Sequence, residues 1–199
     1  IKLSNNGLKG SGTLKYLAST ATSDEFTYLP DSVTGPVNSF LITETISGVE
    51  YPEVAADSGY YRWLTTKDSL LVTSVKEKPF SVYNDQALMK GTLKLTPEHL
   101  YGDGVVAVKD GEIESKNIVF NQHVFSSDTT NFRLLTLDKS QLALATYVYS
   151  ANVDMKERVG EFSSTGGTSL VELPANQYVC FMDKFEWLMD EEKISLFNT

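Results

Sequence analysis

Alternation of apolar and polar residues with a period of two runs along almost the whole chain and limits what it can fold into. Such alternation is typical of half-buried β-strands, and no segment shows sustained helical periodicity. The segments with strand-like patterns are 13–17, 26–29, 37–46, 60–65, 69–75, 79–83, 91–95, 104–108, 112–114, 117–125, 131–137, 141–155, 160–163, 169–173, 177–182, 185–189 and 193–197.

Composition supports the same fold class. Apolar residues make up 41% of the 199 positions and aromatic residues 11%, which is enough for a core of stiff, flat side chains that pack well in sheets. The best helix candidate, 183–192, can also be read as a hairpin. We therefore predict an all-β protein of about sixteen short strands, arranged as a sandwich or as an open, elongated β-roll.

The chain shows signs of internal repetition. Gly12-Thr13-Leu14-Lys15 recurs as Gly91-Thr92-Leu93-Lys94, and residues 8–42 align without gaps on residues 100–134. A duplication would give two similar sub-units, whereas chance reuse of a strand-turn element would not. No Pro-rich or Ser-rich linker interrupts the chain. We therefore expect residues 1–199 to form a single continuous β domain excised from a larger protein.

The segment 141–153 is apolar on both faces of its predicted strand. Leu142, Leu144 and Val148 share one face, and Ala143, Ala145, Tyr147 and Tyr149 share the other. A strand of this kind is either central and covered on both sides or exposed to a ligand on one side. Leu142, Leu144 and Val148 are accordingly candidates for an apolar groove that holds lipid.

The charge distribution excludes one class of partner. The formal net charge is −9 and no basic cluster occurs, so the surface repels phosphate backbones and nucleic-acid binding is not expected. His99 and His123 lack further ligands at metal-binding spacing, and the single cysteine, Cys180, reads as a small buried apolar residue. We predict no catalytic residues, no metal site and no cofactor.

Aromatic side chains offer the alternative of sugar binding. Tyr60, Tyr61 and Trp63 follow a turn, and Trp187 lies in an alternating C-terminal segment. Flat rings on a strand surface can stack on sugar faces, although alternating aromatics more often build a core. These four residues are the candidate stacking positions of a carbohydrate-binding module. A glycoside-hydrolase activity would need only two facing carboxylates, which the sequence leaves open.

Several sequence segments in the second half of the chain resemble a known group of proteins. Residues 88–97, 100–104, 153–162, 171–183 and 185–190 resemble a region of very large exported β-rich proteins of gut-type Gram-negative bacteria. The Gly-punctuated strands are more loosely similar to the β-roll modules of lipopolysaccharide-transport proteins, whose groove holds acyl chains. The resemblance implies a location in the periplasm, outer membrane or cell surface, and it supplies no catalytic residues.

Together these observations predict a non-catalytic structural or interaction module of a bacterial envelope or surface protein, with a possible apolar groove for lipid. The expected partners are other domains of the parent protein, envelope components, lipid or glycan. The alternative is a carbohydrate-binding β-sandwich module.

Overall fold

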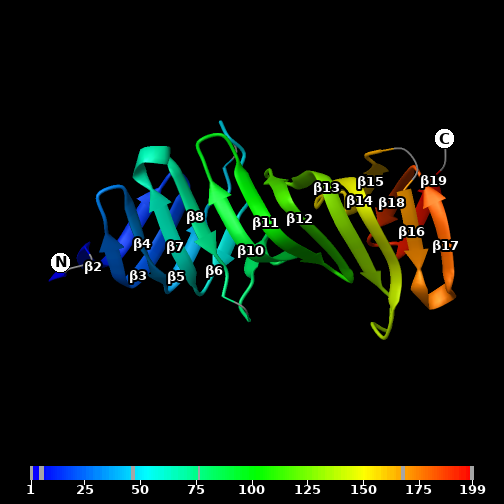
Figure 1. The fold of residues 1–199 in the computed structure, drawn as a ribbon, viewed down its shortest axis with the longest axis horizontal. Coiled ribbons are helices and arrows are strands. Elements are labelled where there is room, and N and C mark those ends of the chain that lie inside the picture. Colours follow the sequence, from blue (N-terminus) through cyan, green and yellow to red (C-terminus); the bar gives the residue numbers. More distant parts are fainter. Residues whose placement is uncertain (1, 5–6, 46–47, 76, 167–168, 198–199) are drawn as a thin grey trace. The chain divides into compact units, whose positions relative to one another are not determined.

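The computed structural model describes residues 2–4, 7–45, 48–75, 77–166 and 169–197 and is nearly all β (Figure 1). Within these residues there is no α-helix, and two 3-10 turns, η1 (Thr65–Lys67) and η2 (Pro174–Asn176), are the only helical elements. The nineteen strands found there are β1 (Lys2–Ser4), β2 (Gly7–Tyr16), β3 (Ser19–Tyr28), β4 (Ser32–Val37), β5 (Ser39–Ile42), β6 (Val54–Ala56), β7 (Gly59–Leu64), β8 (Ser69–Thr73), β9 (Phe80–Val82), β10 (Ala87–Leu95), β11 (Leu100–Val108), β12 (Gly111–Phe120), β13 (Val124–Leu135), β14 (Leu142–Asp154), β15 (Val159–Ser164), β16 (Ser169–Leu173), β17 (Tyr178–Met182), β18 (Lys184–Leu188) and β19 (Lys193–Phe197).

The all-β prediction is confirmed, and the helix candidate 183–192 is wrong. That segment forms β18 and a turn that leads into β19. Phe185 and Trp187 alternate inward along β18 and are fully buried, while the residues between them are partly exposed. A period of two therefore determines the structure of this segment.

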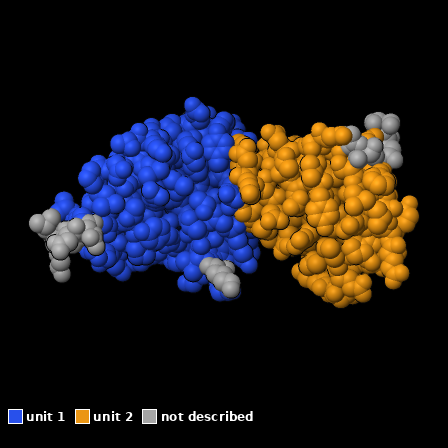
Figure 2. All heavy atoms as spheres, viewed as in Figure 1, with its two compact units in different colours: residues 1–103, 120–122 blue, residues 104–119, 123–199 orange. Residues whose placement is uncertain are grey.

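The chain divides into two compact units (Figure 2). The expectation of a single continuous β domain over residues 1–199 stays a prediction. Unit 1 comprises Ile1–Asp103 and Phe120–Gln122, and unit 2 comprises Gly104–Val119 and His123–Thr199. The division falls inside β11, next to Gly104, whose φ of 149° is open to glycine but strained for other residues. Because the boundary between the units lies within a strand, no Pro-rich or Ser-rich linker marks it in the sequence.

In unit 1 the antiparallel pairings of the described strands close into a ring. The first half of β3 pairs with β5, and its last residues, Thr27 and Tyr28, pair with β4. Strand β10 is shared in the same way, because Ala87–Met89 pair with β9 and Thr92–Leu95 pair with β8. The ring runs in the order β3-β4-β7-β8-β10-β9-β6-β5 and returns to β3. The described strands of unit 1 from β3 to β10 thus form one ring without a break in its pairing.

The interior of unit 1 is filled by aromatic and branched side chains from several strands of this ring. Phe26 of β3 meets Tyr61 of β7 edge to face, with ring centroids 5.7 Å apart. Phe40 of β5 meets Phe80 of β9 at 6.4 Å. All four side chains are at most 2% exposed. Edge-to-face packing of this kind stabilises a core beyond the burial of area alone.

Unit 2 repeats the pairing scheme of unit 1. Strand β14 pairs with β13 along its length, with β15 through Tyr149–Asp154 and with β16 through Ala145 and Thr146. Strand β15 then pairs with β18, β18 with β19, and β16 with β17. These relations reproduce those among β2 to β8, so that β13, β14, β15, β16, β17, β18 and β19 correspond to β2, β3, β4, β5, β6, β7 and β8.

The corresponding strands β7 and β18 carry the same side-chain pattern. Tyr61-Arg62-Trp63 and Phe185-Glu186-Trp187 each alternate an inward aromatic, a charged residue and a tryptophan. Trp63 lies opposite Leu70 of β8, and Trp187 lies opposite Ile194 of β19. The register of this repetition differs from the alignment of 8–42 on 100–134, and a sequence duplication over those ranges stays a prediction.

The recurring phrase Gly-Thr-Leu-Lys has a local structural counterpart. Gly12 in β2 and Gly91 in β10 have φ values of 139° and 142°, in the region that favours glycine. At Gly12 the pairing of β2 with β3 shifts its register, as at a β-bulge. The two phrases therefore share a glycine of the same backbone conformation within a long strand.

Stacked aromatic rings form the core of unit 2. Phe132, Phe162 and Phe185 stack with centroid distances of 4.5 Å for both Phe132–Phe162 and Phe162–Phe185. Trp187 lies 5.2 Å from Phe132. The buried hydroxyl of Tyr149 donates to the carbonyl oxygens of Met182, at 2.7 Å, and Ser169, at 3.1 Å. Burial raises the pKa of Tyr149 to about 12, so this phenol remains a donor at neutral pH.

Replacing Phe162 by Ala tests this stack. Because Phe162 is fully buried between two rings, Phe162→Ala should lower the free energy of unfolding of unit 2 by about 3–5 kcal/mol. Each unit contains one of the two tryptophans, so urea unfolding followed by fluorescence in a Trp63→Phe background reports on unit 2. Tyr147→Ala, at a position 40% exposed, is the control and should change stability by less than about 0.5 kcal/mol. Equal effects of both substitutions would contradict the assigned core.

Candidate functional site

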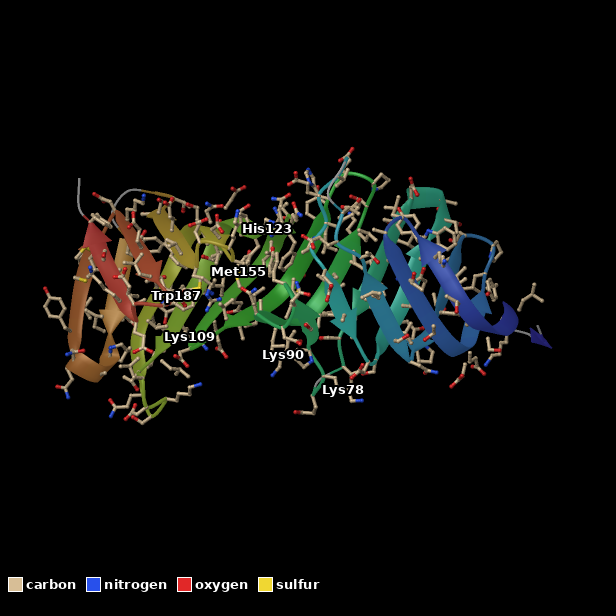
Figure 3. The ribbon with its side chains drawn as sticks, turned by 180° about the vertical axis from the view of Figure 1, so that it is seen from behind. Lys78, Lys90, Lys109, His123, Met155 and Trp187 are labelled. Atoms are coloured by element: carbon tan, nitrogen blue, oxygen red, sulfur yellow. The ribbon has the colours of Figure 1, made fainter. Side chains whose placement is uncertain are left out.

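A cavity of about 570 Å³ lies in unit 2, within the size range of small-molecule sites. Three turns surround it: the β11–β12 turn, the β13–β14 hairpin and the β18–β19 turn. Its lining residues are Lys109, Asp110, Leu134, Leu135, Thr136, Leu137, Asp138, Ser140, Gln141, Ala143, Trp187, Met189 and Glu192. Figure 3 labels two of them, Lys109 and Trp187, on the ribbon of unit 2.

The inner part of the cavity is apolar. Trp187 and Met189 are buried, at 2% and 0% exposure, and contribute their faces to the lining. Leu134 and Ala143, which are partly exposed, come from the ends of β13 and β14. A Cβ built on Gly111 would lie 2.6 Å from the indole of Trp187. The close approach of the start of β12 to the ring of Trp187 therefore requires glycine at position 111.

The rim is polar and carries more acidic than basic groups. Lys109, in a left-handed turn with φ 50°, donates from Nζ to the carbonyl oxygen of Met189 at 2.7 Å and to Oε1 of Glu192 at 3.3 Å. Lys139 of the β13–β14 hairpin forms an ion pair with Asp110 of the β11–β12 turn at 3.0 Å. Asp138 also lies on this rim. The polar edge thus consists of cross-linked turns rather than of isolated side chains.

Asp138 organises the tip of the β13–β14 hairpin. Its Oδ1 accepts hydrogen bonds from the hydroxyl of Thr136 at 2.6 Å, from the amide of Ser140 at 3.1 Å and from the hydroxyl of Ser140 at 2.8 Å. The Thr136 hydroxyl bond, followed by the two Ser140 donors, lowers the pKa of Asp138 to about 2. The carboxylate is therefore ionised at any physiological pH, and it holds the hairpin that forms the outer wall.

The residues proposed for an apolar groove do not line this cavity. Leu144 is 2% exposed and belongs to the core, and Leu142 is partly exposed. Val148 is 51% exposed with a φ of 62°, which shows that β14 is irregular there and does not keep one alternating face. The strand does meet the cavity, but through Ala143 on its other face.

The cavity was not predicted from sequence because its walls come from distant segments. Lys109 and Glu192 are 83 positions apart, and their contact depends on the fold of unit 2. The one available signal was the run Leu134, Leu135 and Leu137, which is more apolar than a solvated hairpin requires. Leu137 is 68% exposed.

The four proposed sugar-stacking residues do not form a platform. Tyr61 and Trp187 are 1% and 2% exposed, so their rings lie in the cores and offer no face to a glycan. In unit 1, Trp63 is partly buried and lies 5.5 Å from the ring of Tyr16 at a tilt of 43°. Tyr60 is 53% exposed on the opposite face of β7 from Trp63. No coplanar exposed pair results.

The remaining polar candidates do not converge on a metal or a reactive group. In the part of the chain that the structure describes, no three His, Cys, Asp or Glu side chains lie close enough together to hold a metal ion. His99 and His123 are both exposed (His123 is labelled in Figure 3). Cys180 is buried on β17, and burial raises the pKa of its thiol. A thiol of this kind is a poor nucleophile, because the thiolate is the reactive form.

Comparisons with protein-family models, with curated proteins and with solved structures give no match for this chain. In the described residues, no helix is both long and apolar enough to span a membrane. The geometry of the cavity is therefore the basis for a functional proposal.

The pKa of Asp138 can be measured by NMR titration of its side-chain carboxyl group. We expect a value near 2, and Thr136→Val should raise it toward the ordinary value of 3.8 because it removes the strongest donor. Since the folded pKa is the lower one, the contribution of Asp138 to hairpin stability is present above pH about 4 and is lost as the pH falls through about 2. A wild-type value near 3.8 would contradict the hydrogen-bonded hairpin tip.

Proposed function

We propose that this chain is a non-catalytic interaction module of a bacterial envelope or surface protein, and that the unit 2 cavity binds an apolar group of its ligand. The observation that carries the proposal is the cavity of about 570 Å³ with Trp187, Met189 and Leu134 in its lining. Small-molecule sites combine such an apolar interior with a few polar groups at the rim.

The charges of the rim narrow the class of ligand. The cavity lining contains three acidic residues and one basic residue, which are Asp110, Asp138, Glu192 and Lys109. Lys139 compensates Asp110 through its ion pair. Because Lys109 is already held by Glu192 and a carbonyl oxygen, it is a poor anchor for an anion. The site therefore favours an apolar chain or ring whose polar end is uncharged or cationic, such as a neutral lipid, over a fatty-acid anion.

The proposed location rests on the resemblance to exported β-rich proteins. The all-β fold is compatible with that resemblance, and fold alone does not establish function. The carbohydrate-binding alternative loses support from the burial of Tyr61 and Trp187, which leaves Tyr60 as the single exposed ring of the proposed four. A glycan would therefore have one stacking position and no platform.

Ligand binding can be followed through Trp187, which lines the cavity and is the only tryptophan left in a Trp63→Phe variant. Titration with a monoacylglycerol below its critical aggregation concentration should change the fluorescence saturably. Ala143→Phe introduces a phenyl ring at the cavity lining and should weaken binding at least tenfold. A fatty acid of equal chain length should bind more weakly at pH 8 than the monoacylglycerol, because the rim is acidic.

The matched control introduces the same side chain outside the cavity. Asn152→Phe is on the same strand, at an exposed position, and should leave the affinity unchanged. Absence of saturable binding in the parent variant, or equal weakening by both phenylalanines, would refute the proposed use of the cavity.

A further inference from the structure

The end of the β13–β14 hairpin, residues 136–141, projects from the strands of unit 2 (Figure 1) and contributes to the lining of the cavity. We call this segment the hairpin tip. The amide of Thr136 donates to the carbonyl oxygen of Gln141 at 2.9 Å, and the amide of Lys139 donates to the carbonyl oxygen of Thr136 at 2.7 Å. The side chain of Asp138 adds the hydrogen bonds described above. The hairpin tip is thus cross-linked internally and can move as one piece.

The pairing of β13 with β14 is irregular just before the hairpin tip. Leu134 lies opposite Leu144 and Leu135 lies opposite Leu142, so the register shifts between them and Ala143 is the extra residue of a β-bulge. A bulge interrupts the ladder and bends the strand that contains it. Ala143 also lines the cavity. The hairpin is therefore least regular at the level of the cavity, between its long ladder and its tip.

Contacts with Asp110 tie the hairpin to the β11–β12 turn. The amide of Leu135 donates to the carbonyl oxygen of Asp110 at 3.0 Å, and Nζ of Lys139 forms the ion pair with its carboxylate. The turn itself is held from its other side, because Lys109 binds the β18–β19 turn. The side chain of Lys139 is 65% exposed, and ion pairs with an exposed partner are weak. The contact between the hairpin tip and the turn can therefore break and re-form readily.

The hairpin tip carries an apolar side chain that is largely in solvent. Leu137 lines the cavity and, at 68%, is the most exposed of the large apolar side chains in the part of the chain that the structure describes. Leu135, at the base of the tip, is 38% exposed. An apolar ligand group in the cavity would contact Leu137 and remove part of this surface from water, which favours binding.

We propose that the hairpin tip is a lid on the cavity, which the ion pair between Lys139 and Asp110 holds closed and whose Leu137 packs against the apolar group of the ligand. The inference rests on the proposed function for the identity of that ligand, a neutral lipid. The ligand enters when Lys139 and the amide of Leu135 release Asp110 and the tip turns about the bulge at Ala143. It is retained when these contacts form again. Lids of binding sites commonly move by such changes at a few residues.

Hydrogen exchange followed by NMR tests the motion of the lid without any ligand. Lys139→Glu replaces the ion pair with repulsion from Asp110 and should speed exchange of the Leu135 amide about fivefold. The Thr136 amide is bonded within the hairpin tip and should keep its rate. In an Asp110→Asn background, Lys139→Glu should have no further effect, because the charge that it repels is gone. Lys116→Glu makes the same charge change at an exposed position of β12 and is the control.

Stopped-flow fluorescence of Trp187 in the Trp63→Phe chain tests the lid with monoacylglycerol as the probe. Leu137→Ser removes the side chain that packs on the ligand and should speed dissociation at least tenfold with little change in association. Lys139→Glu should speed association and dissociation together, each about fivefold, because it opens the lid. Leu29→Ser, at a position 40% exposed in unit 1, is the matched control and should change neither rate.

Three results would overturn the lid. One is exchange of the Leu135 amide that Lys139→Glu leaves unchanged. Another is equal acceleration of the Leu135 and Thr136 amides, which would mean that the tip unfolds instead of moving as one piece. The third is saturable lipid binding whose dissociation rate Leu137→Ser does not alter. Accelerated exchange of the Leu135 amide alone, in a chain that binds no monoacylglycerol, would support the lid and refute the lipid ligand, so the two proposals fail separately.

Discussion

The architecture depends on long strands that pair with two different neighbours through their two halves. A backbone N–H or C=O that is buried without a partner destabilises a fold, so every strand edge that turns away from solvent must find another strand. One half of β3 pairs with β5 and the other half pairs with β4. Strand β14 pairs in the same way with β16 and β15. Each of these strands thereby splits one sheet into two layers, and the aromatic cores lie between the layers.

The positions of the aromatic residues follow from this arrangement. Once β14 has divided unit 2 into two layers, Phe162 of β15 and Phe185 of β18 lie side by side and stack 4.5 Å apart. The charged residue between Phe185 and Trp187, Glu186, then faces the other way. It forms an ion pair with Lys184 on the same face of the same strand, at 3.6 Å. An exposed pair of this kind contributes little, so burial of the rings supplies most of the stability.

Sequence patterns predicted the strands whose own side chains define a buried face. The segments 141–155, 169–173 and 193–197 match β14, β16 and β19 closely, because branched or aromatic residues alternate there. The prediction covered only the end of β3, since Ser19–Tyr28 is rich in Ser and Thr and includes two adjacent acidic residues. Strand β3 forms because its backbone pairs with neighbouring strands, and the residue pattern of β3 itself does not indicate these pairings. The cavity was missed for a related reason, as its walls are turns whose proximity only the fold determines.

The order in which the strands occur along the chain has a consequence for synthesis on the ribosome. Strands β2 to β8 contain most of unit 1, but the ring closes only through β9 and β10, the last of its strands to be made. Until residues 80–95 have left the exit tunnel, β6 and β8 present open apolar edges, the condition in which nascent β proteins aggregate or recruit chaperones. Completion of unit 1 is therefore a late, nearly single event, coupled to the emergence of one hairpin.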